Sequence, residues 1–215
     1  MIRLDIFSDP VCPWCYIGKA RLDRALESRP DHPFEIQWHP FQLNPEMPPD
    51  GMDRRSYLEA KFGGKAGAVA AYTPVAEAAR ETGLEINFEA MNRMPNTLNA
   101  HRLIHWAGLE GRQNAVVDAL FRAYFRDGKD IGDTGTLADI ATSCGMDHDT
   151  AARLLASGAD RDDLMARDLD ARKKGVTAVP TYLIAQKYVV SGAQPVELWQ
   201  KAIDEITGQI VTEDK

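Results

Sequence analysis

Cysteine is scarce in this sequence, and long apolar runs are absent from it. Three of the 215 residues are cysteines. An odd and small number of cysteines is not the framework of a disulfide-stabilised secreted domain, so any disulfide is expected to be catalytic rather than structural. No apolar run approaches the roughly 20 residues that a helix needs to span a bilayer, so the sequence predicts no membrane-spanning segment.

Basic residues are also in the minority. Lys and Arg together number 25 against 32 Asp and Glu, which gives a net charge of -7 and a pI near 5.3. A nucleic-acid-binding surface needs clustered cations, so nucleic acid is not an expected partner. The first residues, MIRLDIF, lack the basic, apolar and small-residue regions of a secretory signal, which predicts a cytoplasmic protein.

Two of the cysteines stand together in the stretch SDPVCPWCYIGK, residues 8–19. Cys12 and Cys15 lie one helical turn apart, beside Pro13 and Trp14. Such a pair is a redox couple, half of a zinc site or a coincidence of packing. A zinc site needs further ligands, and the sequence has no second Cys-x-x-Cys or Cys-x-x-His pair, so no metal is predicted.

The order of predicted elements places this pair at the junction of a strand and a helix. Apolar periodicity predicts strands with period 2 and helices with period 3.6. The predicted strands cover residues 2–7, 34–41, 180–184 and 187–192; the predicted helices cover residues 12–30, most of 45–175, and 195–208. Only Ala185 and Gln186 separate the last two strands, which predicts a hairpin.

This order predicts an α/β protein with a thioredoxin fold. A βαβ unit joined to a ββα unit gives a four-stranded mixed sheet with flanking helices. The sheet and its helices are predicted to come from residues 1–45 and 175–215, and the segment 46–174 is predicted to be a large all-helical insertion. A Cys-x-x-Cys beside a βαβ pattern is typical of a redox site.

The spacing of the pair suits thiol–disulfide exchange. Residues i and i+3 on a helix approach closely enough to form a disulfide. Cys12 at the helix N-terminus is expected to be the attacking nucleophile, because the first-turn amides and the helix dipole favour its thiolate. Cys15 is expected to resolve the mixed disulfide. Trp14 either contacts a substrate or packs on the edge of the sheet, and Pro13 fits the first helical turn.

The chain resembles the DsbA-like thiol oxidoreductases, and more closely their FrnE-like branch, which is related to 2-hydroxychromene-2-carboxylate isomerases and kappa-class glutathione transferases. Five stretches carry the resemblance: SDPVCPWCYIGK (8–19), WHPFQLNP (38–45), NTLNAHRL (96–103), GVTAVPTYLI (175–184) and SGAQP (191–195). The related isomerases and transferases typically carry serine at the first cysteine position. Both cysteines are present here, which favours dithiol exchange.

The resemblance implies a cytoplasmic thiol–disulfide oxidoreductase or isomerase with Cys12 and Cys15 as its redox pair. It also implies that Pro180 is a cis proline beside the cysteines, and that Val179 offers main-chain groups to a substrate. The expected partner is a thiol or disulfide, carried by a protein or by glutathione. No cofactor is implied, although glutathione stays open as a reductant or co-substrate.

Several alternatives remain open from the sequence. Asn96 and His101 are predicted to face the cysteines across the cleft, or else to cap a helix and to pack in the core. Cys144 is expected in the core, and a homodimer is left open. The alternative function is a glutathione-dependent isomerase or transferase for a small aromatic or polyketide-like molecule. A third is a holdase that binds unfolded chains.

Overall fold

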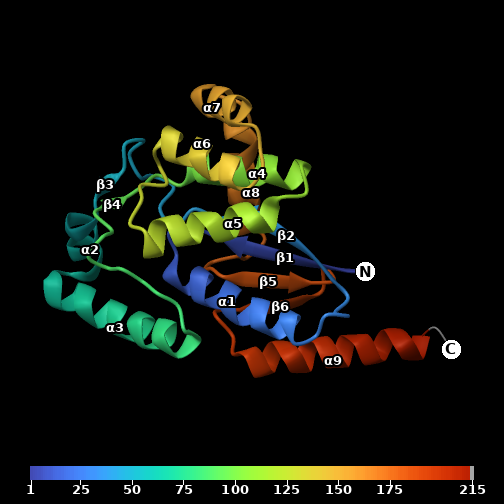
Figure 1. Cartoon of the computed structure of the whole chain (residues 1–215). Coiled ribbons are helices and arrows are strands. Elements are labelled where there is room, and N and C mark those ends of the chain that lie inside the picture. The colour runs from blue at the N-terminus through green and yellow to red at the C-terminus, as the bar shows by residue number, and fades with distance from the viewer. Residues whose placement is uncertain (214–215) are drawn as a thin grey trace.

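A four-stranded mixed sheet forms the centre of the computed structural model, which describes residues 1–213 (Figure 1). The strand order is β2-β1-β5-β6. Strand β1 pairs in parallel with β2 and antiparallel with β5, and β5 pairs antiparallel with β6. The strands are β1 (Ile2–Ser8), β2 (Phe34–Pro40), β5 (Thr181–Ile184) and β6 (Tyr188–Ser191). The predicted α/β thioredoxin fold is therefore confirmed.

Helix α1 (Pro13–Glu27) begins directly after the loop that follows β1. Pro13 suits the first helical turn, where a missing N–H group costs nothing. Gly18 lets the helix approach the sheet closely: a Cβ there would lie 2.6 Å from Tyr182 Oη and 3.1 Å from Pro180 Cγ. The start of α1 is thereby held against the beginning of β5.

The C-terminal hairpin forms as predicted, with a turn one residue longer. Ile184 pairs with Tyr188, and the Lys187 N–H donates to the Ile184 carbonyl at 3.0 Å, so Lys187 belongs to the turn. Helix α9 (Val196–Glu213) continues past Gly208, where the sequence predicted its end. Glycine inside a helix costs only about 1 kcal/mol, so it weakens the helix without ending it.

The segment between β2 and β5 is mostly helical, as predicted, but not entirely. Its short strands β3 (Met52–Asp53) and β4 (Arg93–Met94) form a two-stranded ladder, which corrects the all-helical prediction. The helices are α2 (Arg54–Phe62), α3 (Lys65–Thr82), α4 (Leu98–Leu109), α5 (Gln113–Phe121), the π-helix η1 (Arg122–Arg126), α6 (Thr134–Ser143), α7 (His148–Ala156) and α8 (Arg161–Lys173). The limits of the insertion at 46 and 174 stay a prediction.

The insertion shares one hydrophobic core with the sheet. Tyr16 on α1 stacks on both Phe121 and Phe125, with ring centroids 5.3 Å apart in each case. Helices α2 and α3 stand beside the amino-terminal end of α1 in Figure 1. The insertion is thus packed against the helix that carries the cysteines.

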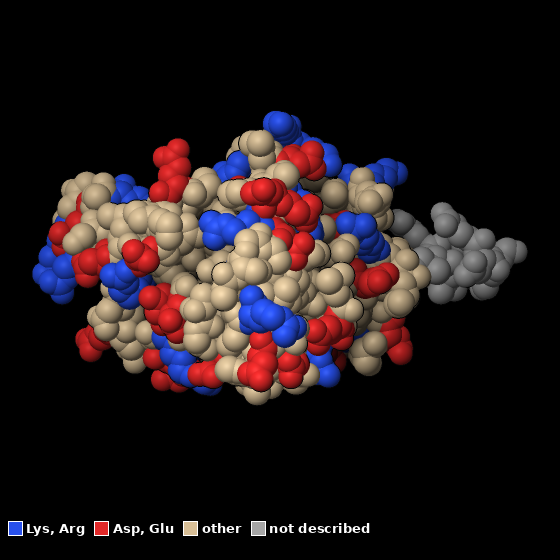
Figure 2. All heavy atoms as spheres, turned by 90° about the horizontal axis from the view of Figure 1, so that it is seen from above, with Lys and Arg blue, Asp and Glu red and all other residues tan. Residues whose placement is uncertain are grey.

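Charges of both signs are spread over the surface. Figure 2 shows Lys and Arg interspersed with Asp and Glu, without a large basic patch among the described residues of that face. Within residues 1–213, no helix has the length and apolar character needed to cross a membrane.

Candidate active site

Cys12 lies at the N-cap position of α1. Its own N–H donates to the Asp9 carbonyl at 2.9 Å, and its carbonyl accepts from the N–H groups of Cys15 and Tyr16. Its thiol donates to the Val179 carbonyl, with 3.6 Å between sulfur and oxygen. The Cys12 side chain is therefore held between the first turn of α1 and the segment that leads into β5.

Cys15 lies one turn inside α1 and is 1% exposed, against 3% for Cys12. Burial raises the pKa of Cys15 well above its ordinary value, and the neighbouring Cys12 raises this pKa further; hydrogen bonding from Ser8 and Asp9 opposes the rise. Both cysteines are free thiols in this structure. The two sulfurs are thus unequal, because Cys15 is strongly held in its neutral form.

The Val179–Pro180 peptide bond, on the other side of Cys12, is cis. Both residues are buried, and Pro180 directly precedes the first residue of β5. The predicted neighbourhood of Cys12, Val179 and Pro180 is therefore present.

A cavity of about 260 Å³ opens beside Cys12. One of its walls, the strand-side wall, comes from segments next to the sheet: Asp9, Val11, Cys12, Pro13, Trp14, Thr177, Ala178 and Val179. The other, the insertion-side wall, comes from α2 and α3: Tyr57, Leu58, Lys61, Phe62, Ala71, Tyr72 and Val75. Trp14 lines the cavity and also packs against the core, so both readings of this residue hold.

The insertion-side wall was not found from the sequence. Its one visible signal is the pair Leu58 and Phe62, which stand at i and i+4 on α2 and therefore share a face of the helix. The pattern alone does not show what that face covers.

Asn96 and His101 do not line the cavity; Thr97 does. The Asn96 side chain donates to the Met47 carbonyl at 2.6 Å and accepts from the Leu98 N–H at 3.0 Å, which ties it to the start of α4 one residue before the N-cap Thr97. His101 faces Asp9: its Nε2 lies 3.7 Å from Asp9 Oδ1. That these two residues face the cysteines across the cleft stays a prediction.

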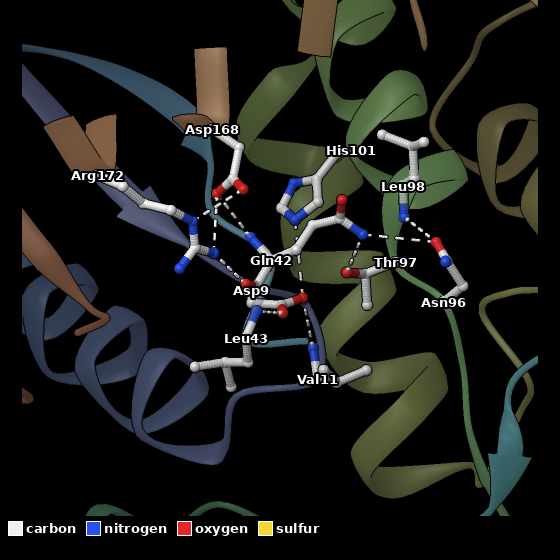
Figure 3. Close-up of polar contacts among 10 residues, drawn as sticks. All are labelled: Asp9, Val11, Gln42, Leu43, Asn96, Thr97, Leu98, His101, Asp168 and Arg172. Carbon is white, nitrogen blue, oxygen red and sulfur yellow. Dashed lines mark hydrogen bonds and ion pairs between the residues drawn. The ribbon is translucent and has the colours of Figure 1, made fainter. Parts of the chain in front are cut away.

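A polar network holds the loop after β2 (Figure 3). Asp168 accepts from the Gln42 N–H at 3.1 Å, and Arg172 donates both to Asp168 and to the Gln42 carbonyl. Asp9 accepts from the next N–H in the loop, that of Leu43, at 2.7 Å. The loop, and Leu43 at the cavity, are thereby fixed from two sides.

The other histidine of α4 and the third cysteine lie apart from Cys12 and Cys15. His105, one turn from His101, contacts Arg167. The described residues contain no cluster of three or more His, Cys, Asp or Glu that would hold a metal ion. Cys144 is half-buried at the end of α6, and its sulfur lies 3.9 Å from Ser143 Oγ.

The chain matches a known protein family over most of its length. The family model of the DSBA-like thioredoxin domain matches residues 3–204. The crystal structure of a probable DsbA oxidoreductase from Streptomyces coelicolor is 32% identical, covers 97% of this chain and 91% of its own, and superimposes with a TM-score of 0.86.

Two more distant structures share the fold. A 2-hydroxychromene-2-carboxylate isomerase is 17% identical, with 98% of each chain covered and a TM-score of 0.75. The cytosolic disulfide reductase DsbM from Pseudomonas aeruginosa, solved with GSH, is 16% identical, with a TM-score of 0.67 over 95% of this chain and 98% of its own. At these identities the two structures show a shared fold, and membership of the FrnE-like branch stays a prediction of the sequence motifs.

Proposed function

Because the chain belongs to the family of DsbA-like thioredoxin domains, we propose that it is a thiol–disulfide oxidoreductase or isomerase that works through Cys12 and Cys15. The placement of Cys12 carries the proposal. Its sulfur stands at the N-cap of a helix and beside a cavity large enough for a side chain or a small molecule.

In the first step, the Cys12 thiolate attacks a substrate disulfide. A bond forms between Cys12 Sγ and one substrate sulfur while the substrate S–S bond breaks, and the second substrate sulfur leaves as a thiolate. The first-turn amides of α1 favour the attacking anion. The Val179 carbonyl at 3.6 Å marks the side from which an extended substrate would approach.

In the second step, Cys15 resolves the mixed disulfide. Cys15 loses its proton, its sulfur bonds to Cys12, and the Cys12–substrate bond breaks, so the substrate is reduced and the pair is oxidised. The raised pKa of Cys15 holds this residue as a thiol until then. The reverse sequence oxidises a substrate dithiol.

The substrate that we propose is a thiol or disulfide carried by a protein or by glutathione. DsbM, a relative in fold, was solved with GSH, which supports glutathione as a reductant or co-substrate. Neither step needs a metal or an organic cofactor. We propose the cytoplasm as the working compartment, in keeping with a chain that has only three cysteines, all of them free thiols.

A redox titration tests the proposal. The purified protein is equilibrated in a series of glutathione buffers, quenched with acid and alkylated, and its free thiols are counted by intact mass. We expect one two-electron transition that Cys12→Ser and Cys15→Ser abolish and Cys144→Ser leaves unchanged. A pair that stays reduced in every buffer would show that the proposal is wrong.

The largely apolar cavity beside Cys12 favours a second candidate. A glutathione-dependent isomerase or transferase for a small aromatic molecule needs one sulfur at most. Turnover of such a molecule that survives Cys15→Ser, together with a stable glutathione adduct on Cys12 in the titration, would favour this candidate over dithiol exchange.

A further inference from the structure

The carboxyl group of Asp9 is buried immediately before the redox helix. Asp9 is 1% exposed and lines the strand-side wall together with Cys12. Its main-chain carbonyl accepts from the Cys12 N–H, its Oδ2 accepts from Leu43, and its Oδ1 lies 3.5 Å from the Val11 nitrogen. These contacts fix an acidic group beside the reactive sulfur, and the exchange steps above give it no task.

His101 is the basic group that faces this carboxyl (Figure 3). It points from α4 in the insertion, is 3% exposed, and brings Nε2 to 3.7 Å from Asp9 Oδ1. Within residues 1–213, that buried nitrogen has no hydrogen-bond partner. Two titratable groups from the two sides of the molecule therefore meet behind Cys12 without a closed hydrogen bond.

Two other charged groups near this contact are already paired. His39 lines the same small hollow as His101, but its Nε2 is bonded to Asp5 at 2.6 Å. On the far side of the loop after β2, Asp168 is bonded to Arg172. Lys61 lines the cavity beside Cys12 from α2, but its Nζ donates to Tyr57 Oη at 3.1 Å. His101 is the basic group in contact with the Asp9 carboxyl, and the low dielectric of a buried site strengthens an electrostatic effect between them.

We propose that Asp9 and His101 are positioning residues that set the reduction potential of the Cys12–Cys15 couple, with His101 offsetting the negative charge of Asp9. This inference rests on the proposed function. Reduction adds two electrons and two protons when both sulfurs end as thiols, and one proton fewer when Cys12 ends as the thiolate that attacks a disulfide. An uncompensated Asp9 charge disfavours that thiolate, and a stabilised reduced form makes a couple more oxidising.

The two single variants are expected to act in opposite directions. We expect His101→Asn to lower the equilibrium constant for reduction of the pair by glutathione about tenfold, which corresponds to about 30 mV for two electrons. Asp9→Asn is expected to raise the same constant about tenfold, because the amide oxygen still accepts from Leu43 while the charge is gone. The double variant is expected to return close to wild type.

His39→Asn is the matched control, since it removes a half-buried histidine that also has an aspartate partner. It is expected to leave the equilibrium constant unchanged. If Asp9→Asn does not fold, His101→Lys replaces it: a retained cation is expected to keep the wild-type constant where His101→Asn lowers it.

The outcomes separate this inference from the function on which it rests. A wild-type protein without a two-electron transition overturns both. A normal wild-type transition overturns the inference alone if His101→Asn and Asp9→Asn leave the constant unmoved or shift it in the same direction. An equal shift in His39→Asn does the same, because a merely structural histidine would then explain the result.

Discussion

The two walls of the cavity differ in the chemical character of their side chains. The strand-side wall carries a thiol, a carboxyl group and the Val179 carbonyl, and its segments are fixed by main-chain contacts at the end of β1 and the start of α1. The insertion-side wall is mostly apolar and aromatic and contains no cysteine. Under the proposed function, we expect the first wall to carry the chemistry and the second to recognise the substrate.

The second wall is held by side-chain packing. Val75 and Ala79 of α3 pack against Ile17 of α1 in a small buried cluster of their own. The rim of this wall is exposed at Phe62, which is 37% accessible. A wall of this kind tolerates substitution better than one fixed by main-chain hydrogen bonds, so its variants should change KM before they change kcat.

The largest expected effect comes from the strand-side wall. Cys12→Ser removes the attacking sulfur and is expected to reduce exchange with a fluorescent peptide disulfide to the uncatalysed background. Cys15→Ser keeps the first step but not the second, so a mixed disulfide on Cys12 is expected to accumulate and to appear by intact mass. Exchange that persists in Cys12→Ser would assign the chemistry to another group.

The next largest effect is a loss of stability in the insertion that leaves the redox midpoint of the cysteine pair unchanged. Arg102 on α4 is fully buried and donates to the main-chain carbonyls of Leu154, Leu155, Ser157 and Ala159. Arg102→Met leaves these carbonyls unsatisfied, and we expect the free energy of unfolding in urea to fall by about 3 kcal/mol.

The matched control is Arg112→Met, because Arg112 is exposed and donates to a single carbonyl, that of Cys144. It should change the free energy of unfolding by less than about 0.5 kcal/mol. Below its unfolding transition, Arg102→Met should keep the wild-type redox midpoint. A shifted midpoint would show that the contacts of Arg102 with residues 154–159 also influence the cysteine pair.

Part of the strand-side wall was predictable from sequence, because Cys12, Pro13, Trp14 and Val179 lie in two short motifs; Asp9, Val11, Thr177 and Ala178 were not predicted as site residues. The CPWC stretch contains the two cysteines, and the VPT stretch contains the Val179 carbonyl that accepts from Cys12. Each stretch also contains a proline that fixes the local backbone geometry. The insertion-side wall was not predictable, since Tyr57 and Tyr72 lie on different helices and meet only through tertiary packing.

His101 shows the same limit on a smaller scale. A motif placed it correctly in the helix near the site, but a sequence does not specify which neighbour a buried side chain meets. The structure places His101 beside Asp9. Asn96 was given helix capping as its alternative role, and the structure places it one residue before the N-cap Thr97, with its side chain accepting from the Leu98 N–H.

A smaller effect is expected at the rim of the insertion-side wall. Phe62→Ala removes an aromatic surface from the cavity, and we expect KM for a peptide disulfide to rise about tenfold with kcat little changed. For a minimal disulfide such as hydroxyethyl disulfide, KM should stay near wild type. Leu109→Ala is the control, because Leu109 is also an exposed apolar residue but lies outside the cavity. An equal rise in KM for both disulfides would show that this wall does not recognise the peptide part of the substrate.

The smallest expected effect is a pH dependence of the free energy of unfolding that comes from His39 on β2. Burial lowers the pKa of His39 from its ordinary value of 6.5, and Asp5 opposes this only in part. The unfolded chain therefore binds the proton more tightly, so the free energy of unfolding falls as the pH drops below about 6.5 towards the folded pKa.

His39→Asn should flatten this fall in urea unfolding measured between pH 7 and pH 5. His148→Asn should preserve it, because His148 lies half-exposed on α7 in the insertion. An unchanged slope in His39→Asn, or a flattened one in His148→Asn, would place the titrating group elsewhere. The expected pattern would assign the loss of stability between pH 7 and pH 5 to the His39–Asp5 contact between β2 and β1.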